Sequence, residues 1–198
     1  LSHNDCVLLH NKSRVISTSR FEELRESAKN TCGHHFDYND SLISANLQII
    51  KCLNNEIDKI EKEINSIMST LDSPIVSIPG ISAISAASII GEFGDFARFD
   101  NAKQLCAFCG VEPSIYQSGT SYHEGKMVKH GSSNLRRTLF NVVPYIIMHN
   151  ETFKTFYDKK RSEGKAYRVA QSHVVKKLLR VIFTLEMTGS TFAPSKLY

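Results

Sequence analysis

The stretch Ile43–Leu71, ISANLQIIKCLNNEIDKIEKEINSIMSTL, repeats apolar residues with a period of seven. Two apolar positions in each heptad form the seam of a coiled coil, and charged residues such as Glu56 and Lys59 lie between them. The pattern predicts one long helix that ends before Pro74. The seam positions are Ile43, Asn46, Ile50, Leu53, Ile57, Ile60, Ile64, Ile67 and Leu71.

The length of this helix constrains its surroundings. About 30 residues extend for about 45 Å, and a helix that long cannot bury one apolar stripe inside a small domain. We therefore expect a coiled-coil partner. It is either a second copy of the chain, which makes the protein a homo-oligomer, or another helix of the same chain in an antiparallel hairpin. Asn46 in the seam would lower stability but fix the register.

The segment before the seam helix is weakly patterned. Ser19–Glu22 has the form of a capping box and predicts a short helix over about 20–29. Cys32–His35 is interpreted as a polar turn, because a zinc site would need a second ligand pair at a suitable spacing. The chain is therefore divided into an N-terminal segment over 1–40, a coiled-coil helix over 41–72 and a C-terminal domain over 73–198.

The C-terminal domain begins with a tight turn at Pro79-Gly80, which we expect between two short helices. This arrangement is similar to a helix-hairpin-helix, in which a glycine and the free N–H groups of the second helix hold a nucleic-acid backbone. Gly80 and Ser82 are the candidate contacts. An ordinary helical corner is the alternative interpretation.

The rest of the domain is predicted to be helical, so the fold class is mainly α. Cys106-x-x-Cys109 shares a face with Leu105 on a helix over 101–109 capped by Asp100, and this indicates core packing rather than a zinc or redox site. Further helices are predicted from Ser132 or Ser133 to about His149, from Asn150 to near Gly164, and over about 166–187.

Charge is distributed unevenly along the chain. Residues 1–100 contain 9 Lys and Arg against 14 Asp and Glu, whereas residues 101–198 contain 15 against 6. The basic half indicates a polyanionic partner, nucleic acid above all, and a basic solvated face is the alternative. Four polar residues spaced four apart on the last helix form a candidate phosphate track, and they are Arg168, Ser172, Lys176 and Arg180.

The apolar runs and the cysteines of the sequence indicate the cellular compartment of the protein. No apolar run approaches the length that spans a bilayer, and no signal-peptide pattern is present. Five cysteines, an odd number without framework spacing, indicate a reducing, cytoplasmic setting. Because the sequence begins with Leu1 rather than methionine, we expect a piece of a longer protein.

The segment Gly110–Arg137 lacks helical periodicity and joins two predicted helices, which is typical of a functional loop. We predict a small β-hairpin with strands at 115–117 and 126–129 and the loop 118–125 between them. A serine hydroxyl attacks phosphorus only where a base accepts its proton, and no Ser/His/Asp set is recognisable near Ser118. Local chemistry alone makes Ser118 a turn residue. The cations of the segment suit a pentacoordinate phosphate, and they are Lys126, Lys129, His130, Arg136 and Arg137.

A series of motifs runs through the C-terminal domain in a fixed order. They are Ser77-Ile-Pro-Gly-Ile81, Gly91-Glu-Phe-Gly-Asp95 with Arg98-Phe99, Gln104-Leu105 through Gly110-Val-Glu-Pro113, Gln117-Ser118-Gly119, Lys129-His-Gly131, Asn134-Leu-Arg-Arg-Thr-Leu139 and Gly164-Lys165. Together, over about residues 73–190, they resemble the C-terminal transposase domain of the DEDD insertion-sequence transposases. That family is related to Piv-type DNA invertases, and its best-studied members are guided by a bridge RNA. The seam helix resembles the coiled-coil region of the family.

The resemblance implies a function. In the family, the serine of the Gln-Ser-Gly motif attacks DNA and forms a transient phosphoserine linkage, which gives that role to Ser118. The family's other catalytic part is an N-terminal RuvC-like domain whose four acidic residues bind a divalent metal such as Mg²⁺. Residues 1–40 have neither its strand pattern nor its length. The resemblance therefore implies no cofactor or metal site in this chain, and a fragment that is inactive alone.

Three hypotheses follow. The leading one is a fragment of a transposase or site-specific recombinase that binds DNA and a guide RNA. The second is a non-catalytic nucleic-acid-binding and dimerisation module, and the third is an unrelated helical scaffold. The residues predicted to contact nucleic acid are Gly80, Ser82, Gln117, Lys126, Lys129, His130, Arg136, Arg137, Lys165, Lys176 and Arg180.

Overall fold

A computed structural model describes residues 18–30, 37–118 and 121–194, with the backbone alone for Thr18, Phe21, Asp37, 113–118 and 121–126. The chain forms two units, Leu1–Asn54 and Asn55–Tyr198, and the boundary between them falls inside one long helix. Each unit is described by itself. In the described part of the chain, no helix is both long enough and apolar enough to cross a membrane.

The first unit contains α2 (Thr18–Lys29) and the beginning of α3 (Asp37–Leu71). Helix α2 confirms the short helix predicted over about 20–29. Helix α3 confirms the long helix, although it begins before the predicted heptads because residues 37–42 continue the helical backbone. The predicted turn Cys32–His35 lies outside the described residues.

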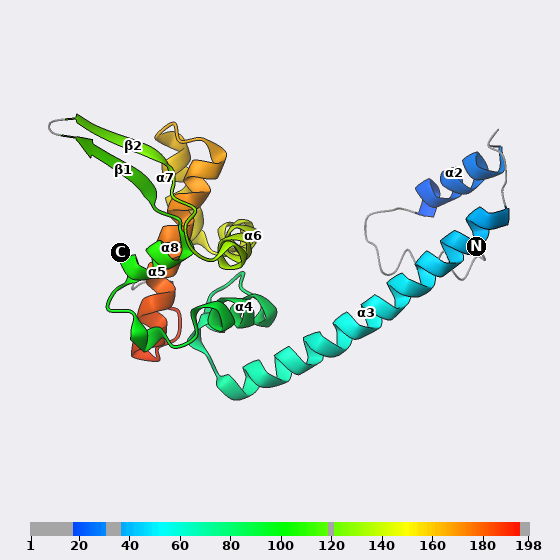
Figure 1. Ribbon diagram of the computed structural model, residues 1–198, viewed down its shortest axis with the longest axis horizontal. Helices are drawn as coiled ribbons and strands as arrows, with labels where there is room; N and C mark the ends of the chain where they lie inside the picture. The colour runs from blue at the N-terminus through cyan, green and yellow to red at the C-terminus, as the bar shows by residue number, and fades with distance from the viewer. Residues whose placement is uncertain (1–17, 31–36, 119–120, 195–198) are drawn as a thin grey trace. The chain divides into compact units, whose positions relative to one another are not determined.

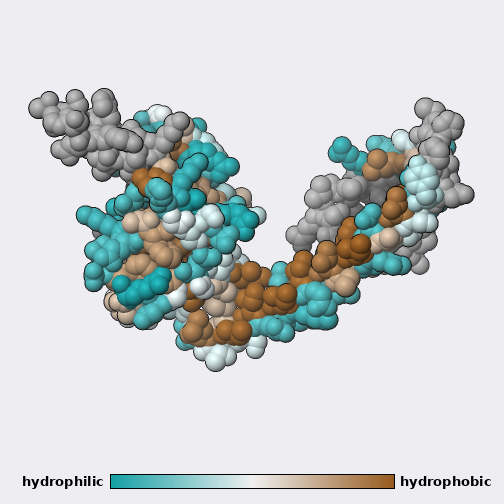
Figure 2. Space-filling model, in the orientation of Figure 1, coloured by the Kyte–Doolittle hydropathy of each residue, from teal (hydrophilic) through white to brown (hydrophobic). Residues whose placement is uncertain are grey.

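The seam of α3 is open to solvent, and its apolar stripe is visible in Figure 2. Ile43, Ile50 and Ile57 are each half exposed or more, and Ile67 is 65% exposed. The antiparallel hairpin within one chain is therefore not formed by the described residues. The last turns of α3 are not fully exposed. Met68, which lies next to the seam, is buried in the core of the second unit.

The second unit is a helical core built around α8 (Tyr167–Thr188), which packs against α5 (Ala102–Cys109), α6 (Ser133–His149) and α7 (Glu151–Ser162) (Figure 1). The other helices are η1 (Pro74–Ser77), α4 (Ala83–Phe93) and η2 (Phe96–Arg98). The buried side chains of α8 include Val174, Val175, Leu178, Leu179 and Ile182. The mainly α fold class is confirmed.

Side-chain caps fix where the helices begin. Ser132 accepts a hydrogen bond from the backbone N–H of Leu135 at the start of α6, and Asn150 caps α7, as the sequence predicts. The predicted cap Asp100 is wrong. Asn101 caps α5, because its Oδ1 accepts from two backbone N–H groups, while the Asp100 carboxylate accepts from a glutamine side chain instead.

The predicted hairpin is present, with different bounds. Strand β1 (Pro113–Ser118) pairs antiparallel with β2 (Ser121–Met127), and a register shift follows Pro113. The pairing continues to Ser118 opposite Ser121, so the return strand begins five residues before the predicted one. Tyr116 and Tyr122, residue types that favour strands, belong to this extended pairing.

Candidate nucleic-acid interface

The base of the hairpin is a crossing of two backbone segments. Gly110 has φ +64°, and a Cβ on it would lie 2.1 Å from the carbonyl oxygen of His130. Gly131 has φ +111°, and a Cβ on it would lie 2.1 Å from the carbonyl oxygen of Phe108. Only glycine permits this approach, because any side chain would collide with a backbone that cannot give way. The end of α5 and the start of α6 therefore meet directly.

Arg136 holds this crossing together. Its Nη1 donates to the carbonyl oxygen of Cys109 at 3.0 Å and to that of Lys129 at 3.3 Å, so one side chain joins both arms of the hairpin base. Lys129 itself has a φ of +35°. Sequence reasoning assigned Arg136 to phosphate and missed this structural role. A guanidinium carries five N–H donors, so contact with a phosphate stays a prediction.

Ser118 is the last residue of β1 and lies opposite Ser121. Five residue steps separate it from Pro113, which places it about 17 Å along the strand from the hairpin base. Gln117 lies beside it, whereas Lys126 is next to Met127, the partner of Pro113 at the base. The arm therefore separates the predicted nucleophile from the nearest predicted cation.

The other predicted cations of this segment lie at or beyond the base. Lys129 and His130 follow β2 and are exposed, and Arg137 is exposed on α6. The structure thus brings Lys126, Lys129, His130 and Arg137 to the end of the hairpin that joins the helical core. It does not gather them around Ser118.

The predicted turn at Gly80 is present, but its first helix is only the four-residue η1. Gly80 has φ +96°, and a Cβ there would lie 2.8 Å from the backbone of Tyr145 and Ile146. The close approach that glycine permits is therefore made to α6. Ser82 caps α4, since its Oγ accepts from the N–H of Ser85 at 3.2 Å. Nucleic-acid contact at Gly80 and Ser82 stays a prediction.

The predicted phosphate track on α8 turns gradually around the helix, and phosphate contact along it stays a prediction. Twelve residues separate Arg168 from Arg180, a rotation of about 120° around the helix. Arg168 donates to Gln171, and the Ser172 hydroxyl donates back to the carbonyl oxygen of Val169. Lys176 and Arg180 instead share a face with His173 and Lys177, which sequence reasoning missed although their spacing of three and four residues gives the signal.

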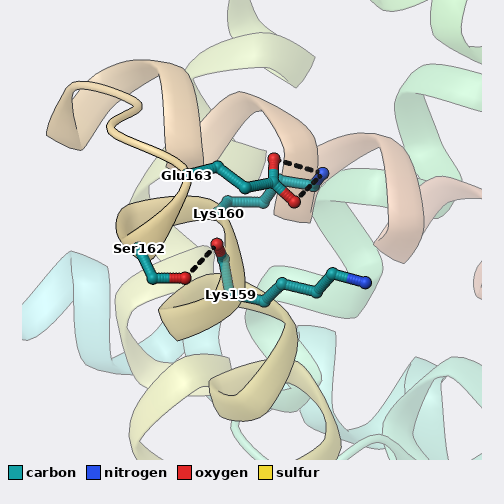
Figure 3. A network of polar contacts seen from close by, with 4 residues as sticks. All are labelled: Lys159, Lys160, Ser162 and Glu163. Carbon is teal, nitrogen blue, oxygen red and sulfur yellow. Dashed lines mark hydrogen bonds and ion pairs between the residues drawn. The ribbon is translucent and has the colours of Figure 1, made fainter.

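Positive charge surrounds His173. Burial lowers the pKa of this imidazole, and Lys160, Lys176 and Lys165 lower it further. Lys165 is exposed in the turn between α7 and α8, so the structure brings it into the neighbourhood of Lys176. Lys160 is neutralised in part, because its Nζ lies 2.8 Å and 2.9 Å from the two carboxylate oxygens of Glu163 (Figure 3).

The two cysteines of α5 confirm the core interpretation. Burial raises the pKa of both the Cys106 and the Cys109 thiols, and Cys106 raises that of Cys109 further. Both side chains are buried in the hydrophobic core. Glu112 raises the pKa of Cys106 further, and Arg180 and Lys176 of α8, against which α5 packs, lower it.

With this geometry in view, the chain was compared with known proteins. Residues 72–158 match the model of the transposase IS116/IS110/IS902 family. The matched range contains α4, α5, α6, most of α7 and the whole hairpin, and it ends before α8.

Three curated relatives agree with this transposase match. An insertion element IS110 uncharacterized 43.6 kDa protein of Streptomyces coelicolor is 24% identical over 140 residues, 70% of this chain and 34% of the relative. The pilin gene-inverting protein of Moraxella bovis is 25% identical over 181 residues, 89% of this chain and 53% of the relative. That of Moraxella lacunata is 26% identical over 117 residues, 57% of this chain and 36% of the relative. The chain thus spans between a third and about half of the length of these relatives.

The described residues do not fit the divalent metal that the transposase resemblance implies. Where the structure describes side chains, no three His, Cys, Asp or Glu residues gather in a way that could hold a metal ion. No metal-dependent step is therefore derived from this chain.

Proposed function

We propose that this chain is the nucleic-acid-engaging part of a transposase or site-specific DNA recombinase that acts in the cytoplasm with a guide RNA, and that Ser118 is its nucleophile. The observation that carries the proposal is the family match over residues 72–158, which contains the whole hairpin. The position of Ser118 at the far end of β1 supports it, because a residue there can reach a DNA strand without unfolding the helical core.

The proposed step is a transesterification. The Oγ of Ser118 forms a bond to a backbone phosphorus, and the bond from that phosphorus to one sugar oxygen breaks. The serine proton passes to a base, and the leaving sugar oxygen takes up a proton. We propose that a RuvC-like domain outside this chain supplies the base and the metal.

The cations at the hairpin base have a different task. About 17 Å along the arm corresponds to about five base-pair steps of DNA at 3.4 Å each. We propose that the exposed Lys129 and Arg137 hold backbone phosphates several nucleotides from the reacting one. Their charge fixes the position of the DNA but is too far away to stabilise the transition state strongly.

The experiment that tests this function looks for the covalent intermediate. A protein that carries this chain behind a RuvC-like domain is incubated with the ends of its insertion element, Mg²⁺ and its guide RNA, and then quenched in denaturant. We expect a protein–DNA adduct whose peptide map places the phosphate on Ser118. The chain of 198 residues alone is expected to bind the same DNA, with an affinity that falls steeply with salt, and to form no adduct.

A second candidate is the non-catalytic nucleic-acid-binding and dimerisation module. It is favoured by the open seam of α3. Salt-dependent DNA binding without any adduct, even with the RuvC-like domain present, would select this candidate and reject the nucleophile.

We propose that the seam of α3 pairs with a second copy of the chain. Ile57→Lys puts a charge into the seam and is expected to convert the oligomer into monomers at about 10 µM, because burying an unpaired ammonium costs several kcal/mol. Sedimentation velocity measures the change. Asp58→Lys, one residue outside the seam, is the control and is expected to leave the mass unchanged. A monomeric wild-type chain at this concentration would contradict the proposal.

A further inference from the structure

A cavity of about 440 Å³ opens beside α8. Apart from Phe156, the described residues that line it lie outside the range that the family model matches. One face of α8 lines it, with Phe156 of α7 on one side and the segment 190–193 on the other. Val181 and Leu185 are buried and form its floor, whereas Arg180 is exposed at its rim. The α8 residues of this face recur at steps of three and four, and they are His173, Lys176, Lys177, Arg180, Val181, Thr184 and Leu185.

The wall after α8 is fixed in place. The backbone N–H of Phe192 donates to Ser77 Oγ at 2.8 Å. The ring of Phe192 stacks on the buried ring of Phe153, with 6.3 Å between the centroids and 22° between the planes. The cavity therefore has two aromatic boundaries, Phe156 and Phe192, that belong to the packed core of the second unit.

Among the described residues, the lining of this cavity is basic and contains no carboxylate. Lys176 and Arg180 make no hydrogen bond or ion pair through their side chains with any described residue. Lys177 lies over the ring of Phe156, with its Nζ 4.8 Å from the centroid, and burial lowers the pKa of its ammonium. Partly buried positive charge without a partner is unfavourable, and an anion in the cavity would neutralise it. The Thr191 hydroxyl adds a further donor, whereas the Thr184 hydroxyl already donates to the carbonyl oxygen of Arg180 and the Ser190 hydroxyl shares a hydrogen bond with Thr188.

We propose that this cavity binds one unpaired nucleotide of a DNA or RNA strand, with its phosphate at Lys176 and Arg180 and its base against Phe156 and Phe192. Cations beside aromatic rings are the combination that binds single-stranded nucleic acid, where the rings stack with bases and the cations follow the backbone. A volume of about 440 Å³ lies in the range of pockets for small ligands, so it admits one nucleotide and excludes a duplex. The inference rests on the proposed function only in taking nucleic acid as the partner, since the cavity is separate from Ser118.

The test uses the complete chain and fluorescent ten-nucleotide probes: single-stranded DNA, single-stranded RNA of the same sequence, duplex DNA, and a DNA strand without bases. Lys176→Gln is expected to weaken binding of a single strand about tenfold, the loss of one charge-assisted hydrogen bond. Lys103→Gln makes the same charge change at an exposed position of α5, outside the cavity, and is expected to weaken single-strand binding less than about twofold. Thr184→Trp fills the cavity from its exposed rim and leaves the charges intact. It is expected to weaken binding of normal strands about tenfold and of the strand without bases by less than about twofold.

The outcomes decide the proposal. The proposal is supported if Lys176→Gln and Thr184→Trp both weaken binding of the DNA strand, the RNA strand or both. The strand that is affected identifies the source of the nucleotide. Equal weakening for duplex DNA overturns it, because the residues would then form an open phosphate track. Equal wild-type affinity for strands with and without bases also overturns it. If the cavity variants weaken single-strand binding but no adduct forms at Ser118, the proposed function fails and the cavity stands. Circular dichroism confirms that each variant is folded.

Discussion

Replacing Ser118 with alanine in the protein that carries the RuvC-like domain is expected to lower the rate of strand exchange by about 10⁴-fold or more, and to abolish the covalent adduct. The reason is chemical, because no other atom forms the phosphoester bond, and loss of a nucleophile costs this much in other enzymes that work through a covalent intermediate. DNA affinity is expected to stay within about twofold, since the cations lie at the other end of the hairpin. Strand exchange is measured on gels, and affinity by fluorescence anisotropy.

The chain offers a matched control for this substitution. Ser121 faces Ser118 across the hairpin, so Ser121→Ala makes the same chemical change one strand away. We expect Ser121→Ala to exchange strands within about threefold of the wild type. An equal loss in both variants would indicate that the end of the hairpin matters as a structure and would contradict a nucleophilic role for Ser118. If Ser118→Ala exchanges strands at the wild-type rate, Ser118 is not the nucleophile.

Gly110→Ala is expected to lower the free energy of unfolding by about 3 to 4 kcal/mol. The new Cβ would lie 2.1 Å from the carbonyl oxygen of His130, so the backbone crossing must open, and the left-handed φ of +64° adds a further cost. Opening the crossing also lengthens the two hydrogen bonds from Arg136. Urea denaturation followed by circular dichroism measures the change.

Substitution of Gly189 separates the cost of the steric collision from the cost of the left-handed backbone. It ends α8 with φ +63°, nearly the same conformation, and nothing lies within 4 Å of a Cβ placed there. Gly189→Ala is therefore expected to cost only about 1 kcal/mol, the price of the left-handed backbone alone. Equal destabilisation by the two variants would mean that the crossing at Gly110 adds nothing to stability.

The helices were predictable from the sequence because each carries its own local signal. The heptads specify α3, and apolar periodicity places α8 within one residue of its predicted ends. Caps supply the boundaries at Ser132 and Asn150. The exception at α5 is instructive: Asp100 and Asn101 are both good capping residues, and only the packed structure decides between them.

The candidate site was less predictable because its parts come from distant segments. The register of the hairpin depends on pairing across the turn, and the alternation of apolar and polar residues is weak there, so the sequence alone placed the return strand too late. The role of Arg136 depends on two backbone carbonyl groups that no side-chain pattern encodes. The cavity beside α8 joins Phe156, α8 and Phe192, which periodicity within one helix cannot bring together.

The length of the hairpin determines how far Ser118 lies from the hairpin base. Its base is anchored by the glycine crossing, and from Ile115 onward its two strands pair residue by residue up to Ser118. Lengthening each strand by two residues would move Ser118 outward by about 7 Å, or about two base pairs of DNA. In the proposed recombinase, this arm is a molecular ruler: it sets the spacing between the place where DNA is held and the place where it is cut.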